Sequence, residues 1–317
     1  MKIVIPGGTG QVGTLLAQAM VSVGHEVVVL SRTPTPQAWR VVQWDAETPG
    51  EWTREIEGAD VVINLAGKSV NCRYTPENRR LITESRTKST QVIGTAISNA
   101  KSPPRVWLQA STATIYAHRY DAPNDEATGI MGGEEPNAPD TWKFSIGVAK
   151  AWEKALNDAE TPYTRKVALR SAMIMSPDKD GVFNVLSGLV RRGLGGQSGS
   201  GKQYVSWIHD LDFIRSIEWL ISREDMEGAV NLASPHPVPN AEFMQILRKA
   251  WGVPFGIPAP QPILEIGAFF LKTETELLLK SRRVVPGRLL ENGFMFQFPD
   301  WLSAAQDLCK RSRELKH

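Results

Sequence analysis

Three glycines near the N-terminus, Gly7, Gly10 and Gly13, are spaced three residues apart. They follow a short apolar run and precede apolar residues at helical spacing, which predicts a strand, a tight turn and a helix. In such a unit the first glycine makes the turn, the second leaves room for a pyrophosphate at the helix N-terminus, and the third lets helix and strand pack closely. A simple glycine turn is the competing interpretation, but the flanking elements favour dinucleotide binding. The predicted contacts in this segment are Gly7, Thr9, Gly10, Gln11, Val12 and Gly13.

The second predicted strand ends in Ser31 and Arg32. An acidic residue at this place, about 20 residues past the glycines, would hold the ribose 2′-hydroxyl of NAD. Arg32 can instead pair with a 2′-phosphate through charge-assisted hydrogen bonds, and the Ser31 hydroxyl can donate another. The alternative is an ordinary surface arginine. These two residues favour NADP(H) as the cofactor over NAD(H).

Small residues also follow the predicted strand at 61–63, in the run Asn64-Leu65-Ala66-Gly67. Leu65, Ala66 and Gly67 would let the backbone pass beneath the adenosine and ribose of a bound cofactor; a plain strand-end turn is the competing interpretation. Arg86, on a long predicted helix, is a further candidate contact, although arginines on helices are usually solvated.

The elements that must position these residues alternate along the first two thirds of the chain, as short β-branched runs and helical patterns. This alternation indicates a parallel sheet built from βαβ units. The sequence therefore predicts an α/β protein with a doubly wound parallel sheet, the Rossmann fold. The predicted strands are 2–5, 26–30, 41–44, 61–65, 106–110 and 166–169, and the predicted helices include 77–100, 142–159 and 211–221.

After about residue 175 the alternation weakens, with a Gly/Ser-rich stretch and a proline-rich segment. We expect an NADP-binding Rossmann domain over residues 1–175. A smaller C-terminal lobe on the substrate side is predicted from residues 176–201 and 234–317. Residues 202–233 are predicted to rejoin the first domain, because the run at 230–232 has the composition of a strand.

The composition, 42% hydrophobic and 22% charged, is that of an ordinary globular protein. A formal charge of +2 without a dense basic block indicates no nucleic-acid partner. Cys72 and Cys309 lack the spacing of a metal site or a redox pair, and no signal-peptide core or stretch of about 18 apolar residues is present. We expect a cytoplasmic protein with reduced thiols, no metal and no membrane association.

Together these motifs resemble the extended short-chain dehydrogenase/reductase family over nearly the whole chain. Within it, the chain resembles the branch labelled epimerase-family protein or SulA-like cell-division-inhibitor homologue. The segments that carry this narrower resemblance are Gly195-Gly196, Gly199-Ser200-Gly201-Lys202-Gln203, Trp207-Ile208-His209, the run 283–290 and Gly293-Phe294.

In that family a Ser or Thr at the end of the fifth strand polarises a substrate carbonyl, and a Tyr with a Lys four residues later transfers the proton. The resemblance places Thr112 at the hydroxyl position, with Ser111 beside it. Counting back from Glu153, the Tyr and Lys positions fall on Ser145 and Ala149. The resemblance therefore implies that the usual dyad is missing.

Tyr116 has the right chemistry to replace the lost acid or base. Its partner would be Lys143, Lys150 or the cofactor ribose; alternatively, Tyr116 only lines the mouth of the site. The resemblance also places Ile174 beside the nicotinamide.

Two further features have a functional and a structural interpretation. Asp125-Glu126 resembles an acidic pair of sugar-nucleotide epimerases, or it only caps a loop. His209, with Asp210 nearby, either serves a substrate site or is a hydrogen-bonded structural residue.

Two functions remain open at this point. The first is an NADP-dependent oxidoreductase or epimerase, with Thr112, Ser111 and Tyr116 around the reacting carbon of a carbonyl or sugar-nucleotide substrate. The second is an NADP(H)-binding sensor or regulatory protein that has lost its catalytic dyad. A homodimer built from the long helices is a further expectation.

Overall fold

The computed structural model of the chain describes residues 1–178, 181–262 and 274–315. Its main sheet has seven strands in the order β10-β6-β5-β4-β1-β2-β3, and each neighbouring pair is parallel. The order reverses between β1 and β4, which is where open α/β sheets bind ligands. The strands are β1 (Lys2–Pro6), β2 (Glu26–Ser31), β3 (Arg40–Gln43), β4 (Val61–Asn64), β5 (Val106–Thr112), β6 (Arg165–Ser171) and β10 (Gly228–Leu232).

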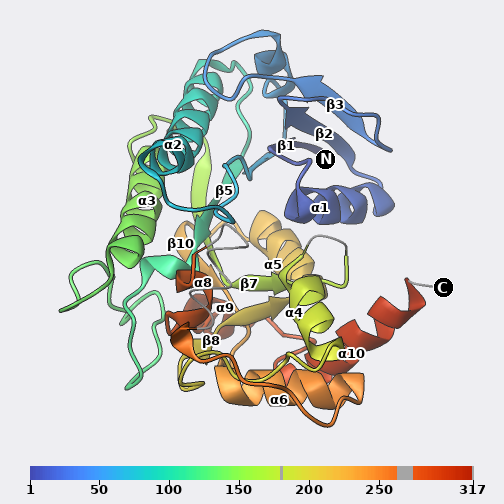
Figure 1. Cartoon of the computed structure of the whole chain (residues 1–317). Coiled ribbons are helices and arrows are strands. Elements are labelled where there is room, and N and C mark those ends of the chain that lie inside the picture. Colours follow the sequence, from blue (N-terminus) through green and yellow to red (C-terminus); the bar gives the residue numbers. More distant parts are fainter. Residues whose placement is uncertain (179–180, 263–273, 316–317) are drawn as a thin grey trace.

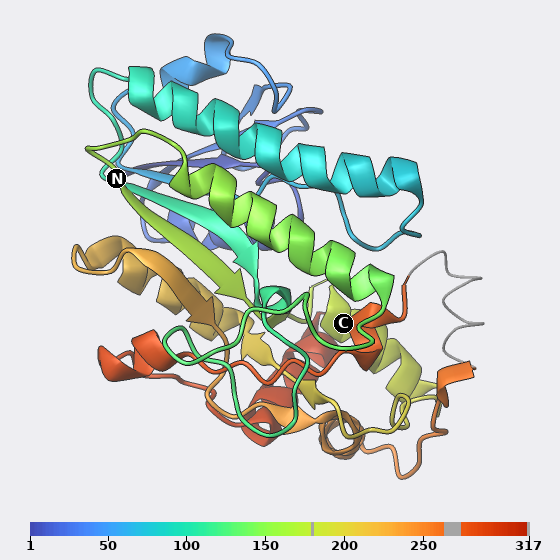
Figure 2. The same cartoon turned by 90° about the vertical axis from the view of Figure 1, so that its left-hand side faces the viewer.

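Helices cover both faces of this sheet (Figure 1). On one face, α1 (Gln11–Ser22) and α5 (Asp210–Ser222) pack against strand residues such as Ile3 and Ile5. On the other face, α2 (Pro76–Asn99) and α3 (Asp140–Asn157) lie side by side over residues such as Val4, as Figures 1 and 2 show. Successive strand residues point to opposite faces of the sheet, and helices cover both faces. Both faces of each central strand are therefore apolar. The predicted doubly wound fold is confirmed.

Local chemistry explains where α2 begins. The hydroxyl of Thr75 accepts a hydrogen bond from the Asn78 amide at 3.3 Å, and Pro76 takes the first helical position. A capping threonine followed by proline is a strong helix start. The predicted and observed bounds of this helix differ by one residue at each end.

A second lobe, seen below the sheet in Figure 1, begins directly after the carboxyl end of β6. Its core includes Trp207, Phe243, Trp301 and Leu308, and the rings of Phe243 and Trp301 stack 4.0 Å apart. The lobe has two pairs of short strands: β7 (Met173–Met175) pairs with β9 (Trp207–His209), and β8 (Tyr204–Val205) pairs with β11 (Val238–Pro239). Its helices are α4 (Val182–Arg191), α6 (Asn240–Trp251), α8 (Glu276–Leu279), α9 (Gly287–Glu291) and α10 (Trp301–Glu314).

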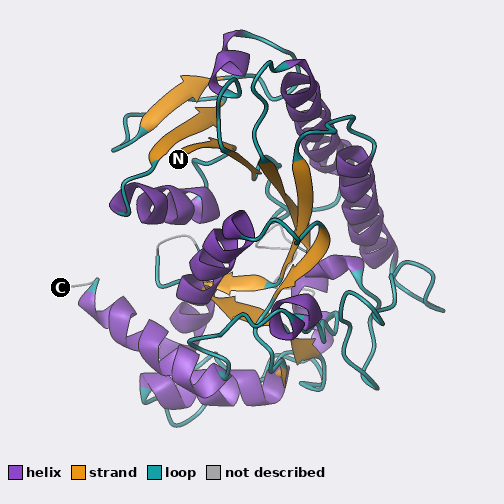
Figure 3. Ribbon diagram, turned by 180° about the vertical axis from the view of Figure 1, so that it is seen from behind, coloured by secondary structure: helices purple, strands orange, loops and turns teal. Residues whose placement is uncertain are grey.

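Between segments of this lobe, β10 returns to the main sheet and pairs with β6. Figure 3 shows the strands and helices of the molecule from behind. The lobe is therefore interleaved with the sheet along the chain, and its elements lie next to strand ends. The predicted division at residues 175, 201 and 233 stays a prediction. Two short 3-10 helices, η1 (Glu51–Glu55) and η2 (Ala113–Ile115), complete the described elements.

Candidate functional site

The loops that follow β1 and β4 touch each other through backbone atoms. Gly7 has a φ of +73°, and a Cβ on it would lie 2.6 Å from the Cα of Ala66. The Leu65 amide donates to the Pro6 carbonyl at 2.9 Å. Any side chain at position 7 would therefore push these two loops apart.

Within the part of the chain that the structure describes, no side chain caps the N-terminus of α1. Gly10 is its N-cap, with no capping side chain and no acidic residue in the first turn, and a Cβ on Gly10 would meet nothing within 4 Å. A Cβ on Gly13 would lie 2.4 Å from the Cα of Gly8, so the third glycine lets the helix start against its own loop. The free amides and the helix dipole attract an anion here. Thr9 is exposed, whereas Gln11 and Val12 are partly buried.

Ser31 and Arg32 lie at the end of β2, next to β1. The Ser31 hydroxyl donates to the Thr33 carbonyl at 3.1 Å and accepts from the Thr33 amide, which shapes the turn. Arg32 is exposed and forms no ion pair with any residue of the described ranges. Its cation is therefore available to a phosphate at this edge of the sheet.

Arg86 holds the loop after β4 in place. Its guanidinium is partly buried, donates to the carbonyls of Lys68 at 2.9 Å and Ile82 at 3.0 Å, and lies over the ring of Trp152. A Cβ on Gly67 would come within 3.1 Å of it. Burial lowers the pKa of Arg86 to about 10. The geometry gives this residue a structural role beside Gly67, and its predicted contact with a cofactor stays a prediction.

A buried polar network joins the end of β5 to α3, β6 and β10. Ser111 donates to Glu153 at 2.6 Å, and both carboxylate oxygens of Glu153 accept from Arg170 at 2.8 Å. Arg170 also donates to the Tyr116 hydroxyl at 2.9 Å, which donates in turn to the Asn231 side chain at 2.9 Å. These five side chains hold three strands and a helix in register.

The Tyr116 hydroxyl is committed to this network. Tyr116 is 2% exposed, and its burial raises its pKa. Lys143 and Lys150, the partners considered for it, are exposed on α3, whereas its hydroxyl faces Arg170 and Asn231. The geometry supports a positioning role, and proton transfer by Tyr116 stays a prediction.

Thr112 differs from its neighbour Ser111, because it is partly exposed as the last residue of β5. Its hydroxyl oxygen accepts from the Thr114 amide at 3.1 Å and thereby caps η2. This bond uses the oxygen and leaves the hydroxyl proton to donate to a substrate oxygen. Thr112 therefore has the geometry that its predicted role requires.

Ala149, which the resemblance places at the lysine position, is fully buried and packs in one apolar cluster with Ala113, Ile115 and Tyr116. Ser145, which the resemblance places at the tyrosine position, donates to the Glu276 carboxylate at 2.5 Å. Sequence reasoning missed Glu276, because it lies 131 residues away along the chain and no local motif marks it.

Other candidates take structural positions. Asp125 caps its own turn by accepting from the Ala127 amide, and Glu126, whose pKa burial raises, accepts from the Asn231 amide at 2.7 Å. Ile174 lies in β7, opposite Ile208, and packs on the sheet core.

His209 is fully buried and stacks on Phe298. One ring nitrogen accepts from the Leu211 amide, so the other donates to Asp307 on α10 at 3.1 Å. Burial lowers its pKa. These contacts support the structural interpretation.

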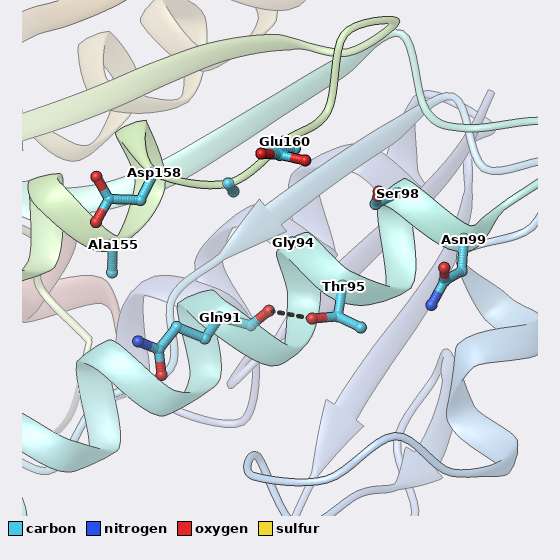
Figure 4. A pocket seen from close by; sticks show the side chains of 9 residues that line it. Gln91, Gly94, Thr95, Ser98, Asn99, Ala155, Asp158 and Glu160 are labelled. Carbon is cyan, nitrogen blue, oxygen red and sulfur yellow. Dashed lines mark hydrogen bonds between the residues drawn. The ribbon is translucent and has the colours of Figure 1, made fainter.

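A groove of about 310 Å³ lies between the C-terminal ends of α2 and α3 (Figure 4). These ends lead into the first residues of β5 and β6, so the groove is at the opposite sheet edge from the glycine loop. No large apolar residue of α2 or α3 is strongly exposed, and the homodimer expected from these helices stays a prediction. The groove is lined by Gln91, Gly94, Thr95, Ser98, Asn99, Ala155, Asp158, Ala159 and Glu160.

The three described ranges, residues 1–178, 181–262 and 274–315, contain no helix long and apolar enough to cross a membrane. They also contain no group of three or more His, Cys, Asp or Glu side chains that could hold a metal ion.

Comparison with known proteins places this geometry in a family. Residues 3–233 match the model of the NAD dependent epimerase/dehydratase family, and residues 259–308 match a domain of unknown function, DUF1731. The bovine epimerase family protein SDR39U1 is 30% identical over 97% of this chain and 99% of its own length. An epimerase family protein of Staphylococcus epidermidis is 30% identical over 98% and 99%.

Solved structures give the same result. The crystal structure of human epimerase family protein SDR39U1 (isoform 2) with NADPH is 29% identical, with a TM-score of 0.85 over 98% of this chain and 99% of that one. UDP-glucose 4-epimerase of Thermotoga maritima, solved with UDP-glucose, is 14% identical over all of both chains, with a TM-score of 0.76, and shows the shared fold alone. The chain belongs to the NAD dependent epimerase/dehydratase family.

Proposed function

We propose that this protein binds NADP(H) and is an oxidoreductase or epimerase of a small carbonyl compound or its secondary alcohol, with sugar nucleotides as one candidate substrate class. The observation that carries the proposal is the N-terminus of α1, which has no capping side chain and open space over Gly10 among the described residues. Arg32, at the next strand end, forms no ion pair within the same ranges. The human relative solved with NADPH supports the choice of cofactor.

The glycine loop would hold the pyrophosphate through backbone amides, and Arg32 the 2′-phosphate. Leu65, Ala66 and Gly67 would lie beneath the adenosine, and Ile174 beside the nicotinamide. The bound nucleotide supplies or accepts the hydride. Thr112 would donate a hydrogen bond to the substrate oxygen, while Ser111 and Tyr116 hold the end of β5 through Glu153 and Arg170.

A regulatory protein that binds NADP(H) without turnover is the second candidate. One observation favours it: the lysine position of the family is Ala149, packed in an apolar cluster. A protein that retained this site only for binding would need no proton-transfer dyad. The two candidates share the cofactor site and differ in chemistry.

Titration of the purified protein with NADPH and with NADH, followed by nucleotide fluorescence, tests the shared part. We expect tighter binding of NADPH and no binding to Gly10→Glu, because a carboxylate would fill the open space and repel the pyrophosphate. Failure of the wild type to bind either nucleotide would refute both candidates.

Turnover separates the two candidates. NADPH oxidation is measured with diacetyl, 9,10-phenanthrenequinone and 4-nitrobenzaldehyde, and NADP⁺ reduction with 2-butanol. Conversion of UDP-glucose to its epimer is measured by chromatography, because an epimerase regenerates its nucleotide and causes no net reduction of NADP⁺. The enzyme candidate predicts turnover with at least one of these compounds that falls in Thr112→Val. Binding without turnover of any of them favours the regulatory candidate.

A further inference from the structure

A carboxylate from the second lobe reaches the helix position that the family usually gives to its catalytic tyrosine. Glu276, the first residue of α8, accepts the Ser145 hydroxyl at 2.5 Å, and the Tyr74 hydroxyl lies 3.4 Å from the Ser145 oxygen. In this cluster the sheet domain supplies two hydroxyls and the C-terminal segment supplies the charge.

Burial and charge make this contact more than a surface bond. The Glu276 side chain is 1% exposed, and its other oxygen pairs with Arg282 at 3.4 Å. A carboxylate oxygen that accepts a hydrogen bond from a hydroxyl is placed to take that proton. Glu276 can therefore act as a base toward the hydroxyl that it already accepts.

The cluster also lies next to the strand end at which a substrate oxygen would bind. Arg282 donates to the Thr114 hydroxyl at 3.1 Å, two residues beyond Thr112. Ser145 comes one helical turn before Ala149, which packs on Ala113 and Ile115 of the segment that follows β5. Ser145 is partly exposed, whereas Glu276 behind it is buried. The hydroxyl is thus the member of the pair that a substrate can touch.

We propose that Ser145 and Glu276 together replace the missing Tyr-x-x-x-Lys dyad, with Ser145 as the catalytic residue that exchanges a proton with the substrate oxygen and Glu276 as the base behind it. This inference rests on the proposed enzymatic function. It adds a residue of the DUF1731 segment to the active site, which explains why the two segments occur in one chain.

The proposed reaction moves two protons and one hydride. In the oxidative direction the substrate O–H proton moves to the Ser145 oxygen, and the Ser145 proton moves to the Glu276 carboxylate. The O–H electron pair forms the C=O bond, and the hydride leaves carbon for the NADP⁺ of the proposed function. The proton on Glu276 then returns through the partly exposed Ser145 hydroxyl to solvent. Reduction is the reverse, with a protonated Glu276 carboxyl as the acid.

The alternative is that Glu276 only fixes the C-terminal segment to α3. The same segment provides a matched control, because Glu274 also docks it: its carboxylate accepts the Tyr74 amide at 2.8 Å and pairs with Arg73 at 3.3 Å. Among the described residues, Glu274 forms no hydrogen bond with Ser145, and it lies outside the proposed proton transfer. If both glutamates only dock the segment, Glu276→Gln and Glu274→Gln should lose similar amounts of activity. If Glu276 takes the proton of Ser145, only Glu276→Gln of these two variants should lose activity.

The experiment compares Glu276→Gln, Ser145→Ala, Ser145→Thr and Glu274→Gln with wild type, using the fastest compound of the turnover panel. Removal of a general base typically costs about 100-fold or more. We expect kcat to fall about 100-fold in Glu276→Gln and Ser145→Ala, with the acidic limb of the pH profile lost in Glu276→Gln. Ser145→Thr, which keeps a hydroxyl, and Glu274→Gln stay within about fivefold of wild type. NADPH fluorescence titration and thermal melting confirm that each variant is folded with an intact cofactor site.

Each outcome decides the matter. If Glu276→Gln or Ser145→Ala turns over at the wild-type rate, proton transfer through Ser145 and Glu276 is wrong, but the proposed function still stands. The same conclusion follows if Glu274→Gln loses as much activity as Glu276→Gln. An unfolded Glu276→Gln leaves the decision to Ser145→Ala and Ser145→Thr, which keep the Glu276–Arg282 pair. If wild type binds NADPH but turns over no compound of the panel, the enzymatic function and the proton transfer through Ser145 and Glu276 fail together.

Discussion

The two halves of the candidate site are built in different ways. The edge formed by the loops after β1, β2 and β4 is made of backbone atoms, with glycines that allow close approach or leave open space. The edge beyond β5 is made of side chains that meet from distant parts of the chain, such as Ser111, Glu153 and Asn231. The first kind of site depends on local conformation, whereas the second depends on the completed fold.

This difference determines what a substitution does. In the backbone half of the site, which is formed by the loops after β1, β2 and β4, a single added carbon changes the shape of a loop. In the side-chain half, a substitution leaves partners behind, and its cost depends on how deeply the unpaired group is buried. Variants in each half sharpen or break the comparison.

The largest effect is expected for Gly7→Val. A Cβ there would meet the Ala66 backbone at 2.6 Å, at a φ of +73° that disfavours side chains. Since the contact is backbone on both sides, the two loops must separate. We expect NADPH binding to be lost in fluorescence titration.

Gly24→Ala is the matched control. Its φ is +83°, but a Cβ would meet nothing within 4 Å, so only the conformational cost of about 1 kcal/mol remains. NADPH binding should persist in this variant. Equal losses in both variants would show that positive φ, rather than loop contact, explains the sensitivity.

The backbone half could be predicted from the sequence because its determinants are contiguous. The spacing of Gly7, Gly10 and Gly13 between a strand and a helix specifies the turn, and the six predicted strands of the sheet are confirmed. The role expected for Gly13 differs in detail, since it packs against Gly8 of its own loop rather than against the strand.

The side-chain half could be predicted only as far as its motifs are local. Thr112 was found from the end of β5, but neither the Glu153–Arg170 pair nor Glu276 carries a spacing that marks it. Tyr116 shows the limit most clearly, because its chemistry suggested proton transfer and only the fold reveals Arg170 and Asn231 at its hydroxyl. Side chains that meet through long-range packing leave no pattern in a single sequence.

Glu153→Gln tests how much the buried side-chain network contributes to the free energy of unfolding. Arg170 is 7% exposed and would keep a buried charge without a counterion. Breaking one partner of a buried pair costs about 3 to 5 kcal/mol. We expect a decrease of about 3 kcal/mol in the free energy of unfolding, measured in urea.

Asp158→Asn removes an ion pair with Lys154 at the end of the same helix. Both side chains of this pair are largely exposed. Such pairs contribute about 0 to 1 kcal/mol. If this exposed pair cost as much as Glu153, burial would not be what distinguishes the network.

Lys280 gives the side-chain half a pH dependence that the backbone half lacks. Its side chain is 2% exposed, donates to the Thr114 carbonyl at 2.7 Å, and burial lowers its pKa to about 7 from 10.5. Between these values the unfolded chain binds a proton that the folded chain lacks, so stability increases with pH. The slope for one group is about 1.4 kcal/mol per pH unit.

Urea unfolding of wild type and Lys280→Met at pH 7, 8 and 9 measures this slope. We expect the wild-type free energy of unfolding to rise more steeply with pH than that of Lys280→Met, by about 1 kcal/mol per unit. Parallel lines for the two proteins would show that Lys280 titrates as it does in water.

Arg32→Ala asks whether the backbone half of the site needs any side chain at all. Arg32 is exposed, so its bond to a 2′-phosphate would be weakened by solvent. We expect NADPH affinity to fall about tenfold, or about 1.4 kcal/mol, with little change for NADH. Arg54→Ala, at an exposed arginine of η1, should change neither affinity. An unchanged preference for NADPH in Arg32→Ala would mean that backbone amides alone select the nucleotide, and the contrast between the two halves would then be complete.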